Sequence, residues 1–221
     1  MKTFKLSLLS LVVLIVLAAC SSEPMQGTIT KQDFGTADID TAFNVAAPRG
    51  GVGAVVVGAT TGALDGVNKG AQDAFIRKYD GGVVWAEQFG TRGSERATDV
   101  VVTSTGVSYV VGLTDGALGF KVGFSDVFLR KYNRNGVLQW TRQFGTLGRD
   151  AARDVTLDSS GNVYVLSVAS KTDFTIRKFS PSGSLLKTIS KTAAGIYGAS
   201  ALAVDSKGTI SVLTGFFSGS T

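Results

Sequence analysis

A segment that recurs along the chain at a fixed step constrains the fold more than any other feature. The tripeptide Phe-Gly-Thr occurs at positions 34–36, 89–91 and 144–146, so the two steps between its three copies are equal. Trp85 and Trp140 are separated by the same step. A regular step of this kind indicates a solenoid, a propeller or another array of similar structural units.

A second motif supports the repeat and indicates strands. Asp-x-Phe-x-Arg-Lys-Tyr occupies residues 73–79 and 126–132, and Asp-Phe-Thr-Ile-Arg-Lys-Phe occupies residues 173–179. Short segments rich in Val, Tyr, Phe and Thr alternate with Gly, Asn, Asp and Ser, as in antiparallel strands joined by tight turns. Each unit is therefore predicted to form four strands, here named a to d in chain order, as in a propeller blade.

The count of strands predicts an all-β, open or incomplete propeller of about three and a half blades. Strand a of the first unit is expected at residues 41–46, and the chain ends with strands a and b of a fourth unit, at 200–205 and 209–215. In the second unit the strands are expected at 98–103, 107–113, 126–132 and 137–144. No c and d strands are expected at the start to close a ring, so either the chain is part of a longer propeller or another chain completes the half blade. A β-sandwich would not repeat one sequence at a fixed step, whereas an open solenoid of small sheets stays an alternative.

Residues 126–140 and 154–165 resemble the SBBP-type β-propeller repeat of bacterial surface and secreted proteins. The resemblance covers roughly residues 33–217 and implies a propeller outside the cytoplasm, but no defined chemistry. The last unit departs from the pattern: it reads Thr188-Ile-Ser-Lys-Thr192 where Phe-Gly-Thr and Trp would stand.

The amino terminus predicts export. Lys2 and Lys5 precede an apolar run, Leu6–Leu17, which is shorter than the roughly 20 residues of a spanning helix. Leu17-Ala-Ala-Cys20 resembles the lipobox of bacterial lipoproteins, which implies cleavage before Cys20 and its modification with palmitate-type acyl chains. An ordinary signal peptide is the alternative.

The predicted organisation is thus a lipoprotein signal peptide (1–19), a lipidated Cys and polar tether (20–32), and a propeller domain (33–221). No Asp follows Cys20, so the lipoprotein pattern favours the outer membrane in a two-membrane bacterium, with the domain periplasmic or surface-exposed.

Composition excludes several chemistries. The chain has no His and one Cys, which rules out Ser-His-Asp and Cys-His catalysis, a Cys/His zinc site and an internal disulfide. The net charge is +5, and removal of residues 1–19 would take two lysines away. This small positive net charge, without a stripe of basic residues, predicts no nucleic-acid partner.

Antiparallel order assigns each connection to one edge of the blades. The a–b and c–d turns share an edge that we name rim two, and the b–c and d–a loops share the opposite edge, rim one. Rim one carries the long segments Thr60–Gln72 and Thr114–Ser125, whereas the third unit has only Ser170–Thr172 there. With its flanking strand starts, rim one holds 11 of the 17 acids and 8 bases. Since function concentrates on loops held by a rigid scaffold, rim one is the candidate binding face.

The candidate residues of this face are polar groups that recur near the repeat step: Asp40, Asn44, Glu95, Asp99, Asp150, Asp154, Asp73, Asp126 and Asp173. The favoured interpretation is that they cap turns or bond to a neighbouring blade. A Ca²⁺ site of carboxylate and carbonyl oxygens is a weaker alternative, and no other cofactor is expected. Paired carboxylates acting in catalysis are weaker still. The Arg-Lys pairs at 77–78, 130–131 and 177–178 are expected to be solvated or to pack between blades. A binding patch for anionic polysaccharide or lipid headgroups is the weaker alternative for them.

The function predicted from these features is a non-catalytic binding or scaffold module for an envelope protein or glycan, anchored to the membrane by lipid. One alternative is a propeller-type lyase or glycosidase that uses carboxylates or Tyr, although the absence of His weakens it. Another is a purely structural envelope protein. Exposed sheet edges at both ends also predict self-association.

Overall fold

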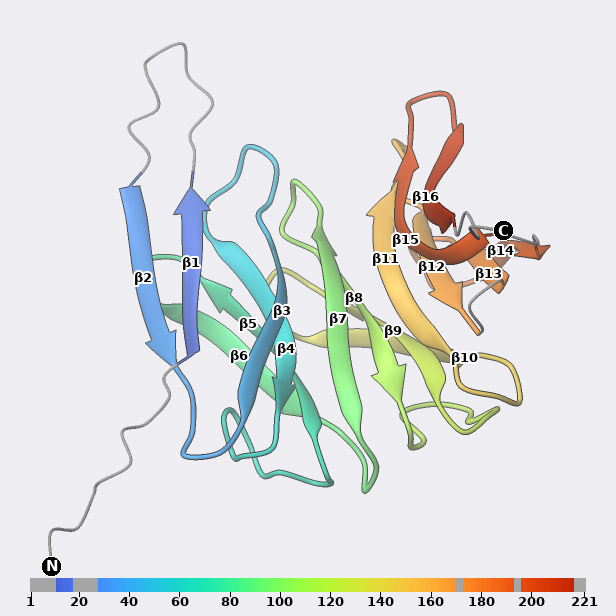
Figure 1. The fold of residues 1–221 in the computed structure, drawn as a ribbon. Coiled ribbons are helices and arrows are strands. Elements are labelled where there is room, and N and C mark those ends of the chain that lie inside the picture. Colours follow the sequence, from blue (N-terminus) through green and yellow to red (C-terminus); the bar gives the residue numbers. More distant parts are fainter. Residues whose placement is uncertain (1–10, 18–27, 170–172, 193–195, 217–221) are drawn as a thin grey trace, which may run out of the picture.

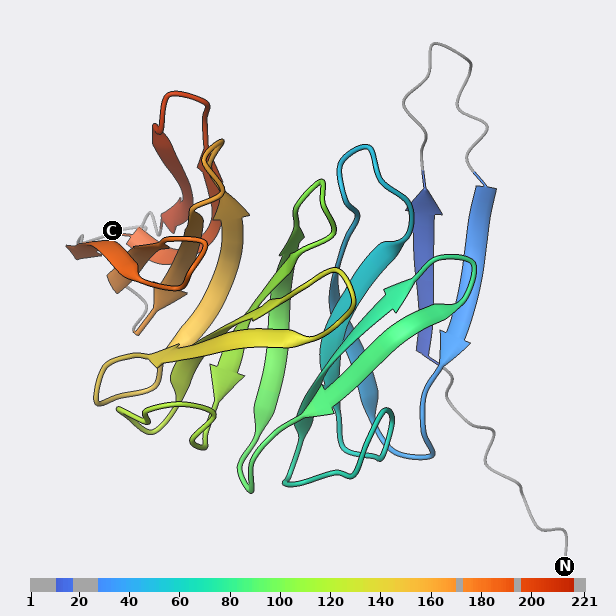
Figure 2. The ribbon, with the colours of Figure 1, turned by 180° about the vertical axis from the view of Figure 1, so that it is seen from behind.

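The computed structural model describes residues 11–17, 28–169, 173–192 and 196–216, in which every regular element is a β-strand (Figures 1 and 2). Within these ranges no helix is long and apolar enough to cross a membrane. The strands are β1 (Leu11–Leu17), β2 (Thr28–Phe34), β3 (Asp40–Ala46), β4 (Ala54–Thr60), β5 (Asp73–Tyr79), β6 (Val83–Phe89), β7 (Glu95–Val102), β8 (Ser108–Thr114), β9 (Asp126–Tyr132), β10 (Leu138–Phe144), β11 (Ala151–Leu157), β12 (Val163–Val168), β13 (Asp173–Phe179), β14 (Leu185–Thr192), β15 (Ile196–Val204) and β16 (Ile210–Phe216).

Three four-stranded antiparallel sheets form complete blades, each with its strands in chain order: β3–β6, β7–β10 and β11–β14. A two-stranded sheet, β15–β16, follows them, and the a strands β3, β7, β11 and β15 contact one another in succession. No sheet closes into a ring among the described residues. The prediction of an open array of four-stranded repeats is confirmed.

The start of the chain corrects the predicted strand count, because β1 and β2 precede the first blade as a two-stranded antiparallel sheet. β2 takes the place of a d strand. The Arg77 guanidinium lies 4.7 Å from the ring centroid of Phe34, as Arg130 lies 3.9 Å from Phe89. Arg177 repeats this contact on Phe144, the d-strand residue of the second blade, at 4.7 Å.

The polar residues 28–33 concealed this strand in the sequence. They were assigned to the tether, although Phe34 already carried the d-strand landmark Phe-Gly-Thr. Residues 28–32 of the predicted tether therefore belong to β2. Cys20 and most of the predicted signal peptide lie outside the described residues. The stacked arginines confirm the interblade packing expected for the Arg-Lys pairs.

A β-bulge corrects the predicted position of the polar inner-strand residues. Asn44, Asp99 and Asp154 are predicted to lie on rim one with the strand starts, and the first strand of the second unit is predicted at residues 98–103, whereas β7 begins at Glu95. Instead each residue follows a register shift within its strand. The extra residue of a bulge has no partner and disturbs the alternation from which strand starts are predicted.

The blades pack through aromatic side chains of the d strands. The Trp85 ring stacks on Tyr132 of the next blade at 6.2 Å, and its Nε1 donates to the carbonyl of Arg134 at 3.1 Å. Gly136 lies under this ring with φ of 79°, and a Cβ there would be 2.5 Å from Trp85. The turn thus needs glycine both for its positive φ and for the close approach.

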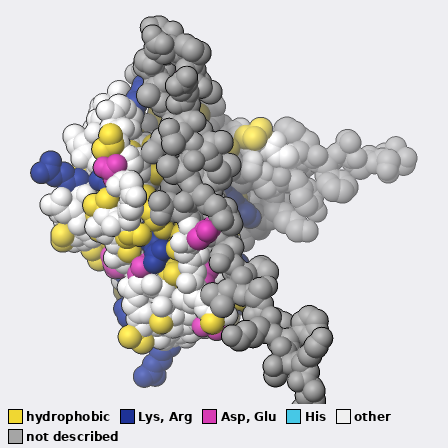
Figure 3. All heavy atoms as spheres, turned by 90° about the vertical axis from the view of Figure 1, so that its left-hand side faces the viewer, with side chains coloured by type: hydrophobic (Ala, Val, Ile, Leu, Met, Phe, Trp, Pro, Cys, Tyr) yellow, Lys and Arg dark blue, Asp and Glu magenta, His cyan; other side chains and the backbone are white. Residues whose placement is uncertain are grey.

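The two ends of the array expose apolar side chains. Figure 3 shows hydrophobic side chains on the surface at the end that carries β1 and β2. At the other end Leu213 is 64% exposed. The prediction that the open edges promote self-association remains untested.

Candidate functional site

Rim one is the lower edge of the first two blades in Figure 1, where the b–c and d–a loops meet. Each d–a loop is held by an acidic side chain four residues beyond the Thr of Phe-Gly-Thr. Glu95 is fully buried and accepts hydrogen bonds from Thr91 N (2.7 Å), Thr91 Oγ1 (2.8 Å) and Thr114 Oγ1 (2.6 Å). Asp40 accepts from N and Oγ1 of Thr36. Asp150 accepts from N and Oγ1 of Thr146.

The long b–c loops are fastened by a glutamine of the d strand. Gln88 Oε1 accepts from Leu64 N at 2.7 Å, while its Nε2 donates to the carbonyl of Gly62 and to Asp73 Oδ2. Gln143 repeats the arrangement in the second blade, where its Nε2 donates to Asp126 Oδ2 at 2.8 Å. These loops are therefore packed against their own blade.

The acids that open the c strands complete this clamp. Asp73 and Asp126 are fully buried, and each accepts a backbone N–H of its own b–c loop, from Lys69 at 3.1 Å and from Val122 at 2.7 Å. Asp73 Oδ1 has no hydrogen-bond partner among the described residues.

Two carboxylates converge on the glycine of Phe-Gly-Thr. A Cβ on Gly90 would overlap Asp73 Oδ1 and would lie 2.8 Å from Glu95 Oε2. The motif thus needs glycine because the acids of the c strand and of the d–a loop occupy this space. No group of three or more Cys, His, Asp or Glu in the described ranges is placed to hold a metal. The carboxylate and carbonyl oxygens present are ligands of the kind that Ca²⁺ prefers, and the weaker alternative of a Ca²⁺ site stays untested.

The bulged inner strands carry a pair of interacting carboxyl groups. Asp99 Oδ2 accepts from Val155 N at 2.7 Å, and Asp154 Oδ2 accepts from Leu202 N at 2.6 Å, so each links its blade to the next. Burial raises the pKa of Asp99 to about 7. The neighbouring Asp154 also raises it, whereas the N–H groups of Val155 and Val100 lower it.

The remaining two candidates differ from this pattern. Asn44 holds the bulge position of the first blade but is exposed. Asp173 is the first residue of β13. The short loop predicted before it, residues 170–172, lies outside the described residues.

A hollow of about 300 Å³ opens on rim one between the loops of the second and third blades. Its lining includes Arg96, Asp115, Ser125, Arg149 and Asp150. Arg96 is exposed, and its Nε donates to Gln72 Oε1 at 2.6 Å. The Arg149 side chain is exposed as well. Two guanidinium groups beside one opening suit a carboxylate-bearing ligand, because each can donate two parallel hydrogen bonds.

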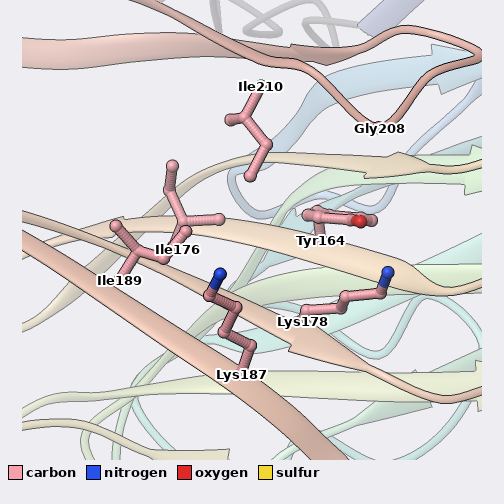
Figure 4. A pocket seen from close by; sticks show the side chains of 7 residues that line it. All are labelled: Tyr164, Ile176, Lys178, Lys187, Ile189, Gly208 and Ile210. Carbon is pink, nitrogen blue, oxygen red and sulfur yellow. The ribbon is translucent and has the colours of Figure 1, made fainter.

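A second hollow, of about 230 Å³, lies between the third blade and β15–β16 (Figure 4). Tyr164, Ile176 and Ile189 supply its apolar wall, and Lys187 stands at the c–d hairpin position that Trp85 and Trp140 hold in the earlier blades. The hollow is therefore the interblade space that Trp fills in the other blades. Its shape follows from the fold and does not indicate a ligand.

Most of the acids predicted for rim one lie there, whereas Asp99 and Asp154 lie within the inner strands. The hydrogen-bond partners of the rim-one acids were not predicted. Gln88 and Gln143 immediately precede Phe-Gly-Thr and recur at the repeat step, a signal that would have identified the clamp. Asp65 was also missed: it binds Arg77 through contacts of 2.5 and 2.6 Å. In the second blade Arg130 pairs instead with Glu87, at 3.2 Å.

Comparison with known proteins agrees with this architecture. The family model of the SBBP β-propeller repeat matches residues 139–174, from the start of β10 to the start of β13. The chain contains an SBBP β-propeller repeat. The resemblance stated from the sequence is thereby confirmed for this segment.

A solved structure shows the same fold over most of the chain. A crystal structure of a protein of unknown function from Bacteroides caccae is 15% identical, with a TM-score of 0.51. The match covers 83% of this chain and 56% of that one, so the chain spans little more than half the length of that protein. No curated protein matches the sequence.

Proposed function

We propose that this SBBP-repeat chain is a lipid-anchored, non-catalytic binding or scaffold module of the bacterial cell envelope. It contacts a protein or glycan through the rim-one hollow. The observation that carries the proposal is the pair of exposed arginines at one opening: Arg96 at the start of β7 and Arg149 in the loop before β11.

The hydrogen bonding of rim one favours binding over catalysis. Glu95, Asp126 and Asp150 accept hydrogen bonds from backbone or hydroxyl donors of their own loops. A carboxylate used in this way positions a loop, and a lyase or glycosidase would need acids that reach substrate. The proposed ligand is an acidic glycan or an acidic protein segment, since guanidinium groups recognise carboxylates.

Replacing Arg149 with Ala is expected to weaken ligand binding by about 10- to 100-fold, the usual effect of losing a charge-assisted hydrogen bond. The measurement is binding to arrays of uronic-acid oligosaccharides and acidic peptides, followed by titration of any ligand found. Arg149 is exposed, so the melting temperature should stay unchanged. Arg134→Ala, at an exposed arginine of rim two, is the matched control. Equal binding by both variants would refute the assignment, and a wild-type protein that binds nothing on the arrays would favour a purely structural role.

Lipidation of Cys20 has its own test. The peptide that begins at Cys20 should carry acyl chains, and the protein should partition into the detergent phase. Cys20→Ser should abolish both. The chain's single cysteine makes the mass assignment unambiguous. An unmodified peptide from the native protein would exclude the anchor without affecting the binding proposal.

A further inference from the structure

The direction of β2 determines where the chain from Cys20 meets the folded domain. β2 runs from Thr28 to Phe34, and Phe34 then leads through residues 35–39 into β3 at rim one. Thr28 therefore lies toward rim two. Figure 1 shows this directly, because β2 starts at the upper edge, beside the β3–β4 turn, and its arrowhead points to the lower edge.

Phe34 attaches the rim-one end of β2 to the first blade. Its ring contacts Phe75 edge-on at 5.6 Å and lies 6.1 Å from the ring of Tyr79, in addition to its contact with Arg77. These contacts belong to the first blade, so β2 keeps an attachment to the domain that does not involve β1. Along its length β2 pairs with β1, whose residues would leave with the predicted signal peptide, so the contacts of Phe34 are the ones expected to remain after cleavage.

The length of the connecting segment limits the alternatives. The segment from Cys20 to Thr28 spans at most about 28 Å when fully extended. β2 alone is about 23 Å long at the usual strand rise. If the segment between Cys20 and Thr28 ran back along β2, it would use nearly all of its length to reach rim one. The long loops of rim one would then still extend farther than Cys20.

Charge is distributed unequally between the two rims. Among the described residues, the cationic groups in or beside the turns of rim two are Arg49, Lys78, Lys131, Arg134, Arg142, Lys178, Lys187 and Lys207, and the acids there are Asp80, Asp158 and Asp205. Several reach the turns through defined contacts: Lys131 Nζ donates to the carbonyl of Pro181 at 2.8 Å, and Arg142 Nε donates to that of Gly183 at 2.7 Å. Rim two is thus predominantly basic.

We infer that rim two faces the membrane and lies against anionic lipid headgroups, so that rim one is presented away from the bilayer. The inference rests on the proposed lipid anchor. Each basic residue near an anionic surface contributes attraction within about a Debye length. The lipid anchor keeps the domain close to the membrane, and the basic turns then determine that rim two faces the lipid headgroups.

Site-specific fluorescence on the full lipidated chain tests the orientation. Cys20 is the only natural cysteine and would be acylated, so Ser160→Cys on rim two and Val67→Cys on rim one each add one reactive thiol. Both positions are exposed, Val67 by 79%. The protein is reconstituted in vesicles of phosphatidylcholine and phosphatidylglycerol that carry a headgroup acceptor. Because the rims are at least about 23 Å apart, energy transfer from position 160 should be about twofold stronger. Equal or stronger transfer from position 67 would overturn the inference.

A charge-reversal set identifies the force involved. Arg49→Glu, Arg134→Glu and Lys207→Glu together should abolish the difference in energy transfer between the two positions. The matched set Lys69→Glu, Arg92→Glu and Lys121→Glu, at exposed rim-one bases, should leave it unchanged. A difference that persists in the first set would refute the role of anionic lipid. The mass of the Cys20 peptide, measured on the same samples, separates this failure from a failure of the anchor itself.

Discussion

Asp99→Asn is expected to make the protein less stable than wild type below pH 5 and more stable above pH 7. Burial raises the pKa of the Asp99 carboxyl to about 7 in the folded chain, whereas an unfolded aspartate titrates near pH 4. At a pH between these two pKa values, the Asp99 carboxyl is protonated in the folded state and ionised in the unfolded state. Wild-type stability therefore falls as the pH rises through this window, by up to about 4 kcal/mol at pH 8.

The amide removes this titration. Its oxygen can still accept the hydrogen bond from Val155 N, and its NH₂ group can donate to Asp154, as the protonated carboxyl does. The amide has only one oxygen, so it can accept a hydrogen bond from Val155 N or from Val100 N but not from both. The lost bond should lower the free energy of unfolding by about 1 kcal/mol at low pH. Above pH 7 the melting temperature of the variant should exceed that of wild type by about 5 °C or more.

Thermal melts from pH 4 to pH 8 provide the measurement, and the first blade provides the control. Asn44→Asp introduces a carboxyl at the same bulge position, where the side chain is exposed. This variant should show the wild-type dependence on pH. If the stability of Asp99→Asn depended on pH as that of the wild type does, the prediction would be wrong, and Asp99 would be ionised at neutral pH without loss of stability.

The repeat made the blade architecture predictable because a fold built from similar units repeats its structural devices. Phe34, Phe89 and Phe144 recur at equal intervals since each receives the arginine of the following blade. The same regularity placed the acids on rim one. Their roles were also within reach, because an acid four residues beyond a Thr is a common turn cap.

Two features were not predictable from local pattern. β2 depends on pairing with β1 and on the contacts of Phe34 with the first blade, while the polar residues before Phe34 resemble a linker. The bulges before Asn44, Asp99 and Asp154 depend on the fit between neighbouring inner strands. Tertiary packing overrides local preference at such places. The rim-one hollow likewise arises only when loops of two blades meet.

Glu95→Ala is expected to destabilise the protein by about 3–5 kcal/mol, because it leaves buried donors without an acceptor. Three bonds to this carboxylate are lost, two from Thr91 and one from Thr114. Glu95 is fully buried, so water cannot easily replace them. The corresponding fall in melting temperature is about 10 °C or more. The stability of Glu95→Gln should lie between those of Glu95→Ala and the wild type. Its amide oxygen can still accept a hydrogen bond, but its NH₂ group would face one of the donors of Thr91 or Thr114.

Asp115→Ala is the matched control on the same rim. Asp115 is half-buried and lines the hollow, and only its backbone contributes to the bonds with Ser94 and Lys121. Its removal should leave the melting temperature unchanged within about 2 °C, as for most surface substitutions. Denaturant unfolding of the three variants measures the difference directly. A Glu95→Ala protein as stable as Asp115→Ala would mean that this carboxylate does not hold the loop, and it would reopen the case for rim-one acids that act on a ligand.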